Sequence, residues 1–196
     1  MDKEAMSHGQ NRTATRRRVL GGVGTMSLGA IAGCLGTGED DNVPDPITID
    51  DGQGCDQCTM VIENHPGPAG QAHYEEPMDV VGEDRPAQFC SSLCTYAFTF
   101  ETDEEPDVVY LTDYSTVDYE IETSGDEAVI SRHLEDAVFG NVSELSLVVD
   151  SDVGGAMGAS MIPFGETADV DAFHEEYGGD RYQHDDVTRE LVMNLM

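Results

Sequence analysis

The sequence predicts an α+β fold, because strand patterns and helix patterns are mixed along one chain of 196 residues. Apolar runs, alternating or continuous, predict strands at 70–75, 86–89, 107–111, 117–121, 128–131 and 145–149. Apolar residues spaced by three and four predict helices that begin near Ser91, Thr167 and Asp186. This amount of structure suits one ordinary domain or two small lobes.

The first 33 residues have the pattern of an export signal rather than of a folded segment. Arg16, Arg17 and Arg18 precede an uncharged stretch at 19–33, which is shorter than the roughly 20 residues that span a bilayer as a helix. Consecutive arginines before such a stretch favour twin-arginine export. Small residues followed by Cys34 match a lipoprotein signal, in which this cysteine is lipidated; an uncleaved N-terminal anchor is the alternative. Either way, we expect the domain on the extracytoplasmic face of the membrane.

The rest of the chain is strongly acidic. Five of the nine basic residues and two of the 40 acidic residues precede Cys34, which leaves four arginines, no lysine and 38 acidic residues in 34–196. The resulting repulsion is screened at molar salt, where the Debye length is about 3 Å. The composition therefore indicates a halophilic, haloarchaeal-type protein, and the lack of basic surface argues against binding to nucleic acid.

The acidic stretch at 34–51 is predicted to be a flexible tether, because it contains Pro44 and Pro46 and has no apolar periodicity. Residues 52–196 then form the folded domain. We expect this domain to divide into lobes at about 52–112 and 113–196.

Four further cysteines form two pairs, Cys55-x2-Cys58 and Cys90-x3-Cys94, separated by 31 residues. Paired cysteines at this spacing, with the second pair at a predicted strand-to-helix turn, are typical of a metal-binding knuckle. Because an oxidising compartment favours disulfides, structural disulfides are the competing interpretation.

Met60 follows Cys58 by two residues. A thiolate and a thioether on one short turn form a soft donor set, which favours Cu(I) over Zn(II) and over hard cations. Methionine is more often a core residue than a ligand, so this pair alone is a weak signal.

Four segments resemble, in order and spacing, the signature of the NosL copper chaperones. They are Cys58-Thr59-Met60, the stretch 66–72, Gln88-Phe89-Cys90-Ser91, and Gly155-Ala156-Met157-Gly158-Ala159-Ser160 followed by Phe164. The resemblance covers the chain from about residue 55 to the C-terminus. It implies two small ββαβ-like lobes, similar in fold to part of organomercurial lyase.

The resemblance also implies a function. NosL proteins are monomeric lipoproteins that bind one Cu(I) and deliver it for maturation of the copper–sulfide centre of nitrous oxide reductase, a denitrification enzyme. They are not enzymes themselves. Carried over to this chain, Cys58 and Met60 are the primary ligands, and Met157 is the candidate third ligand. Cys55 and Cys90 complete the predicted metal-binding set, and Cys34 is the lipidation site.

Two positions depart from the family pattern. Thr59 stands where the family commonly has glycine, so a turn with positive φ is harder to form here. Cys94 is an additional cysteine, which keeps a structural zinc site or a Cys90–Cys94 disulfide open. Nearby, His65 and His73 are expected to be surface histidines rather than ligands.

Two other functions compete with the copper carrier. In the first, all four paired cysteines hold Zn(II), or form disulfides, in a binding module whose partner is unknown. In the second, the chain has an organomercurial-lyase-like or thiol–disulfide activity, which rests on fold analogy and on the Cys-x2-Cys motif alone.

Overall fold

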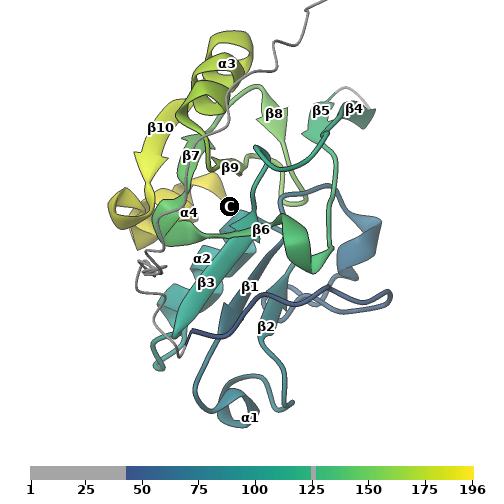
Figure 1. Cartoon of the computed structure of the whole chain (residues 1–196), viewed down its shortest axis with the longest axis vertical. Coiled ribbons are helices and arrows are strands. Elements are labelled where there is room, and N and C mark those ends of the chain that lie inside the picture. The colour runs from purple at the N-terminus through teal and green to yellow at the C-terminus, as the bar shows by residue number, and fades with distance from the viewer. Residues whose placement is uncertain (1–42, 125–126) are drawn as a thin grey trace, which may run out of the picture. The chain divides into compact units, whose positions relative to one another are not determined.

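The structure of the protein is a computed structural model that describes residues 43–124 and 127–196. The predicted export signal, Cys34 and the start of the tether lie outside the described residues. The fold is α+β, as the sequence predicted, and contains two small ββαβ lobes (Figure 1).

The first lobe consists of two strands, a helix and a third strand, namely β1 (Gly70–His73), β2 (Ala87–Phe89), α2 (Ser92–Glu101) and β3 (Val108–Thr112). The central strand is β1, which pairs antiparallel with β2 and with β3. A short helix, α1 (Pro77–Val80), lies in the connection from β1 to β2. On the far side of β3, the sheet is extended by β6 (Phe139–Asn141), so its order is β2-β1-β3-β6.

The second lobe repeats this arrangement with β7 (Ser146–Val149), β9 (Met161–Phe164), α3 (Thr167–Tyr177) and β10 (Asp180–Gln183). Its first strand, β7, is again central and pairs antiparallel with both others. Helix α4 (Arg189–Leu195) follows β10.

A third, smaller sheet contains β4 (Ile121–Ser124), β5 (Glu127–Ile130) and β8 (Val153–Gly154). Its strand β8 runs parallel to β5. Four short 3-10 helices complete the described elements, namely η1 (Ile62–Asn64), η2 (Asp136–Val138), η3 (Val142–Glu144) and η4 (His184–Asp186).

Helix α2 lies between the two lobes. It contacts β1 and β2 of its own lobe and also α4 and β9. The approach to β1 is close, since a Cβ atom on Gly70 would lie 2.3 Å from Oγ1 of Thr95, a contact that only glycine avoids. In the second sheet, Leu147 and Met161 belong to the core cluster that includes α2, whereas Val148 packs into a second cluster beneath α3. Both faces of this sheet are therefore buried.

The outer face of the first sheet is covered by the stretch 43–51, which we had assigned to the tether. The Gln71 side chain accepts a hydrogen bond from N–H of Ile47 and donates one to its carbonyl, and Ile49 is buried. Tyr110, opposite Gln71 on β3, donates to the carbonyl of Pro44. This part of the predicted tether is thus packed on the domain, because polar side chains of the sheet satisfy its backbone groups.

Other elements differ locally from the sequence prediction. Strand β4 starts only at Ile121, where the predicted strand 117–121 ends. Thr167 is the first residue of α3 rather than its N-cap, and α4 starts at Arg189, after a 3-10 turn. Ser91 caps α2 as predicted, with its hydroxyl accepting a hydrogen bond from N–H of Cys94.

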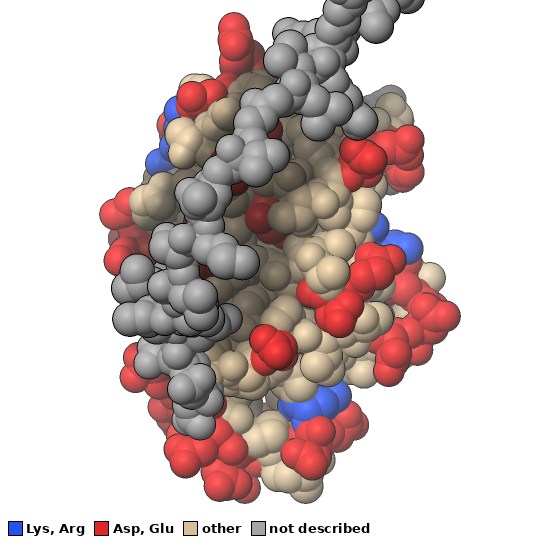
Figure 2. Space-filling model, viewed as in Figure 1, with Lys and Arg blue, Asp and Glu red and all other residues tan. Residues whose placement is uncertain are grey.

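Acidic side chains are distributed around the face shown in Figure 2, whereas basic side chains are few. The acidic side chains on this face therefore do not form a single patch. Within 43–124 and 127–196, none of the helices combines the length and apolar character that crossing a membrane requires.

Candidate metal centre

The four paired cysteines come together in one cluster. The Sγ atoms of Cys55, Cys58, Cys90 and Cys94 all lie within 4.8 Å of one another, and none is in a disulfide. The Sγ of Cys90 is 3.5 Å from that of Cys58 and 3.8 Å from that of Cys94. Three of the cysteines are buried, whereas Cys58 is only half-buried. The cluster therefore consists of three buried cysteines and one that is partly exposed.

The first pair of cysteines is held by a tight loop. N–H of Cys55 donates to the carbonyl of Met60, and N–H of Thr59 donates to the carbonyl of Cys55, each at 2.8 Å. This turn places Thr59 at φ 65°, in the left-handed region that disfavours a β-branched residue. The positive φ expected from the family's glycine is present, and threonine adopts it.

Asp56 joins this loop to strand β2. Its carboxylate accepts two hydrogen bonds from the guanidinium of Arg85, at 2.7 and 2.8 Å, and one from N–H of Gln88 at 2.7 Å. N–H of Asp56 also donates to the carbonyl of Gln88. Because Gln88 precedes Cys90 by two residues, these contacts fix the distance between the two cysteine pairs.

The second pair spans the start of α2. Cys90 follows the last residue of β2, and Cys94 lies on the first turn of the helix, where Ser91 caps its N–H. The two Sγ atoms are 3.8 Å apart, so both thiols point to the same side. Our predicted ligand set omitted Cys94, although the x3 spacing at a helix start was the signal that would have included it.

Hydrogen bonds among the buried thiols shift their pKa values in opposite directions. Hydrogen bonds from Cys90 and Cys94 hold the pKa of Cys55 well below its usual range, and backbone N–H groups of Cys90 and Cys58 act in the same direction. The hydrogen bond to Cys55 raises the pKa of both Cys90 and Cys94, and burial adds to this effect. A cation that binds here must displace the thiol protons, so its apparent affinity depends on pH.

Two methionines pack against the hydrophobic core to which three of the cysteines belong. Met60 and Met157 are both partly buried, and both contact the core cluster that contains Cys55, Cys90 and Cys94. Met157 comes from the second lobe, in a two-residue β-turn closed by hydrogen bonds between Gly155 and Gly158.

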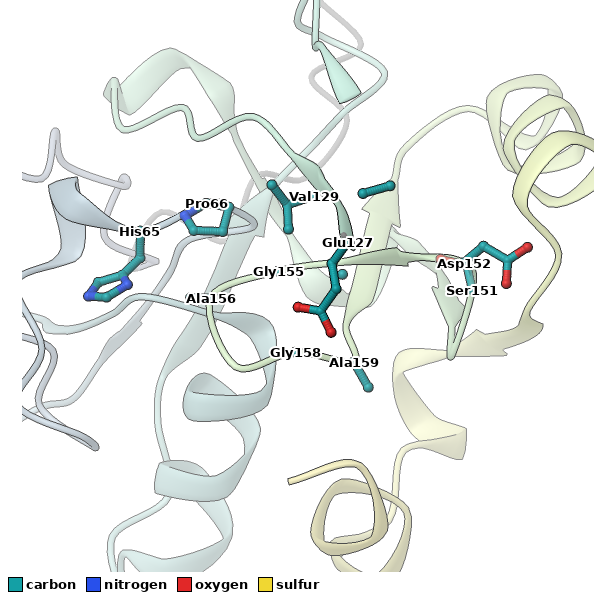
Figure 3. A pocket seen from close by; sticks show the side chains of 12 residues that line it. His65, Pro66, Glu127, Val129, Ser151, Asp152, Gly155, Ala156, Gly158 and Ala159 are labelled. Atoms are coloured by element: carbon teal, nitrogen blue, oxygen red, sulfur yellow. The ribbon is translucent and has the colours of Figure 1, made fainter. Parts of the chain in front are cut away.

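This hairpin fits closely against the first lobe. A Cβ atom on Gly155 would lie 2.4 Å from the carbonyl oxygen of Gly67. Figure 3 shows Ala156 at the turn of this hairpin, and Ala156, His65, Pro66 and Glu127 all line a cleft of about 470 Å³. The second lobe thus carries a thioether to the edge of the first lobe's core.

The nearby histidines differ in position. His65 is half-buried and lines the cleft of Figure 3. His73 is buried, contrary to our expectation of a surface residue, and its Nε2 donates to the side-chain oxygen of Gln71 at 3.2 Å. Because β1 alternates its side chains between faces, His73 lies with Gln71 on the face covered by residues 43–51, opposite α2.

A compact α+β domain with four converging thiols, and with two partly buried methionines packed against the same core, defines a class of protein, namely a small soft-metal-binding protein. The sequence model of the NosL family matches residues 46–192, and the chain belongs to this family. It is 27% identical over 175 residues to the copper-binding lipoprotein NosL of Stutzerimonas stutzeri, covering 87% of this chain and 83% of that protein.

The crystal structure of the copper chaperone NosL from Shewanella denitrificans has a similar fold. The TM-score is 0.59 at 28% sequence identity, and the match covers 72% of this chain and 94% of the Shewanella chain. Family membership and the cysteine cluster together support metal binding, and the two named relatives are a copper-binding lipoprotein and a copper chaperone.

Proposed function

We propose that this protein is an exported, lipid-anchored carrier that binds Cu(I) and delivers it for maturation of nitrous oxide reductase. The observation that carries the proposal is that Cys58, which lies two residues before Met60, is the one partly exposed cysteine among four clustered thiols. Soft thiolate and thioether donors select Cu(I) over hard cations. The S. stutzeri relative is a copper-binding lipoprotein and the S. denitrificans relative is a copper chaperone, which supports the same role.

A carrier must release its metal to a partner. Release by ligand exchange requires that the partner's donor atoms reach the ion while the carrier's ligands leave one by one. Cys58, Met60 and Met157 are all partly exposed, so an ion bound by them meets this requirement. No nucleophile or general base is needed, since the metal is cargo.

The test is a competitive titration of the reduced protein with Cu(I) against a chromogenic chelator in molar salt. Cys58→Ser and Met60→Leu are each expected to weaken Cu(I) binding by about tenfold or more, because each removes a ligand. Met78→Leu is the matched control, since Met78 is exposed and lies on α1. Unchanged affinity in both ligand variants would contradict the carrier proposal.

The location is tested separately. We infer that the chain is exported by the twin-arginine route and held at the extracytoplasmic face through a lipid on Cys34. Cys34→Ser is expected to move the protein from the membrane fraction to the soluble fraction without changing Cu(I) affinity. Equal membrane retention of the Cys34→Ser variant would contradict lipid anchoring.

A second candidate, a structural Zn(II) knuckle, is favoured by the spacing of the sulfurs. Two thiolates bound to one tetrahedral zinc at about 2.3 Å are about 3.8 Å apart. The Cys58–Cys90 and Cys90–Cys94 separations of 3.5 and 3.8 Å are close to this value. In that case Met60→Leu is expected to leave zinc binding unchanged.

A further inference from the structure

The centre contains more sulfur donors than one ion can use. Four thiols lie within 4.8 Å of one another, and the thioethers of Met60 and Met157 pack against the same core cluster. A zinc ion takes four such ligands, and soft donors of both kinds suit Cu(I). Four thiols and the thioethers of Met60, two residues after Cys58, and of Met157 together offer more donors than a single four-coordinate ion uses.

These donors also differ in accessibility. Cys55, Cys90 and Cys94 are 2%, 1% and 0% exposed, so a partner cannot reach an ion that they hold. Cys58, Met60 and Met157 are partly exposed. The inner thiols suit an ion that stays, whereas the outer donors suit an ion that leaves.

We propose that the centre holds two soft d10 metal ions at once. A resident ion is bound by Cys55, Cys90 and Cys94, and a transferable Cu(I) is bound by Met60 and Met157. The thiolate of Cys58 bridges the two ions. This inference rests on the proposed function for the outer ion only.

The geometry supports a bridging role for Cys58. Its Sγ is 3.5 Å from that of Cys90, within the reach of one shared ion, yet its side chain lies on the accessible side of the cluster. A thiolate sulfur has three lone pairs and can bind two metals. Cys58 is thus the one thiol that can contact both an inner and an outer ion.

The inner site is held rigidly by the first lobe alone. Asp56 fixes the loop of Cys55 to β2, and the Ser91 hydroxyl fixes N–H of Cys94. The outer site includes Met157 from the second lobe, in the hairpin between Gly155 and Gly158. Separating the lobes slightly would weaken the outer ion's coordination and leave the inner site intact.

The resident ion can be Cu(I) or Zn(II), since both bind thiolates, and the test distinguishes them. The reduced whole chain is dialysed in molar salt against buffered Cu(I), against Zn(II), or against Zn(II) followed by Cu(I). Bound metal is then counted per chain, and its removal by a strong Cu(I) chelator or a zinc chelator is timed.

We expect two ions per chain, either two Cu(I) in the first arm or one of each metal in the third, with one removed at least tenfold faster than the other. A total of one metal ion per chain, a Cu(I), in both arms that contain copper would overturn the two-ion inference but leave the carrier proposal intact. One Zn(II) with no Cu(I) bound would overturn both.

Variants assign the two ions to their donors. Cys94→Ser is expected to lower the count from two to one, with the remaining Cu(I) removed quickly. Met60→Leu is expected to retain the slow ion and lose the fast one, and it alters a partly exposed position that folding tolerates. Met78→Leu should keep both ions. Loss of the slow ion in Met60→Leu, or an unchanged count in both ligand variants, would overturn the assignment.

Discussion

The two lobes share one topology, but the turn between the second strand and the helix has a different role in each. In both, the first strand is central and the turn from the second strand into the helix lies at one end of the sheet. In the first lobe this turn is Cys90-Ser91 and carries half of the thiol cluster. In the second lobe it is Gly165-Glu166 and carries no thiol.

The second turn is instead closed by polar groups from the connection between the lobes. The carboxylate of Asp113 accepts a hydrogen bond from N–H of Gly165 at 2.7 Å, and Ser115 accepts one from N–H of Glu166. A Cβ atom on Gly165 would lie 2.6 Å from the Asp113 carboxylate, so glycine is required there. The strand-to-helix turn of this motif can therefore carry clustered thiols, as in the first lobe, or be held by hydrogen bonds to the connecting segment, as in the second.

The largest effect is expected from breaking the support of the first turn. Asp56→Ala removes the two-bond partner of Arg85, which then pairs only with the exposed Glu83, although the Asp56 and Arg85 side chains are only 15% and 18% exposed. We expect the free energy of unfolding to fall by about 3 kcal/mol, and metal affinity to fall about tenfold or more. Chemical denaturation at fixed molar salt measures the first effect, and Asp171→Ala, in the exposed pair with Arg181, is the control.

A smaller effect is expected from opening the second turn. Asp113→Ala removes a buried carboxylate that accepts hydrogen bonds from N–H of Gly165 and of Ser115. The expected loss is about 2 kcal/mol of unfolding free energy, because hydrogen bonds to charged groups are strong. Metal affinity should not change. A tenfold loss of Cu(I) affinity in this variant would show that the two turns do not act separately.

Relieving backbone strain should stabilise only the first lobe. Thr59 and Asp150 are the non-glycine residues with positive φ in the described part of the chain, at 65° and 54°. Thr59→Gly is expected to raise the unfolding free energy by about 1 kcal/mol, because a β-branched residue is strained in this region. Asp150→Gly is the control, since aspartate tolerates the conformation better. Thermal unfolding of both variants measures the effect, and equal rises in Tm would contradict a greater strain at Thr59.

The smallest expected effect is a pH dependence of the first lobe's outer face. Burial lowers the pKa of His73 from its usual value of 6.5, although Asp107 opposes this. The unfolded chain therefore binds the proton more readily, and stability falls as the pH drops below 6.5 towards the folded-state pKa. Comparing unfolding at pH 7.5 and 5.5 should show a smaller fall in His73→Gln than in His65→Gln. The reverse order would contradict this account.

Local signals in the sequence were sufficient for much of the fold. Ser91 capped its helix, and Gly178, at φ 72°, ends α3 as the Gly178-Gly179 pair indicated. Strands β6, β8, β9 and β10 were missed. Strands β6 and β8 are only three and two residues long, β9 contains Pro163, and β10 is mostly polar. The packing of 43–51 was also missed, since its backbone is held by Gln71 and Tyr110, which are distant in sequence.

The sequence was sufficient to predict a site built from cysteines, but not to decide which residues complete it. Spacing indicated that the two cysteine pairs belong to one metal-binding knuckle, and the structure places all four in one cluster. The copper ligand set taken from the family resemblance omitted Cys94, which joins the others because β2 places Cys90 directly before the start of α2. The contribution of Met157 depends on how the lobes pack, which local patterns do not encode.

The packing of residues 43–51 on the first sheet limits how far the domain can extend from its anchor. Only residues 34–42 separate the proposed lipid site from the ordered chain, and nine residues span at most about 30 Å when fully extended. With a lipid on Cys34, the domain therefore works close to the bilayer surface. Under the carrier proposal, a receiving protein would have to present its own copper ligands within that short distance of the membrane, which would restrict delivery to partners that are membrane-bound or that dock beside the lipid headgroups.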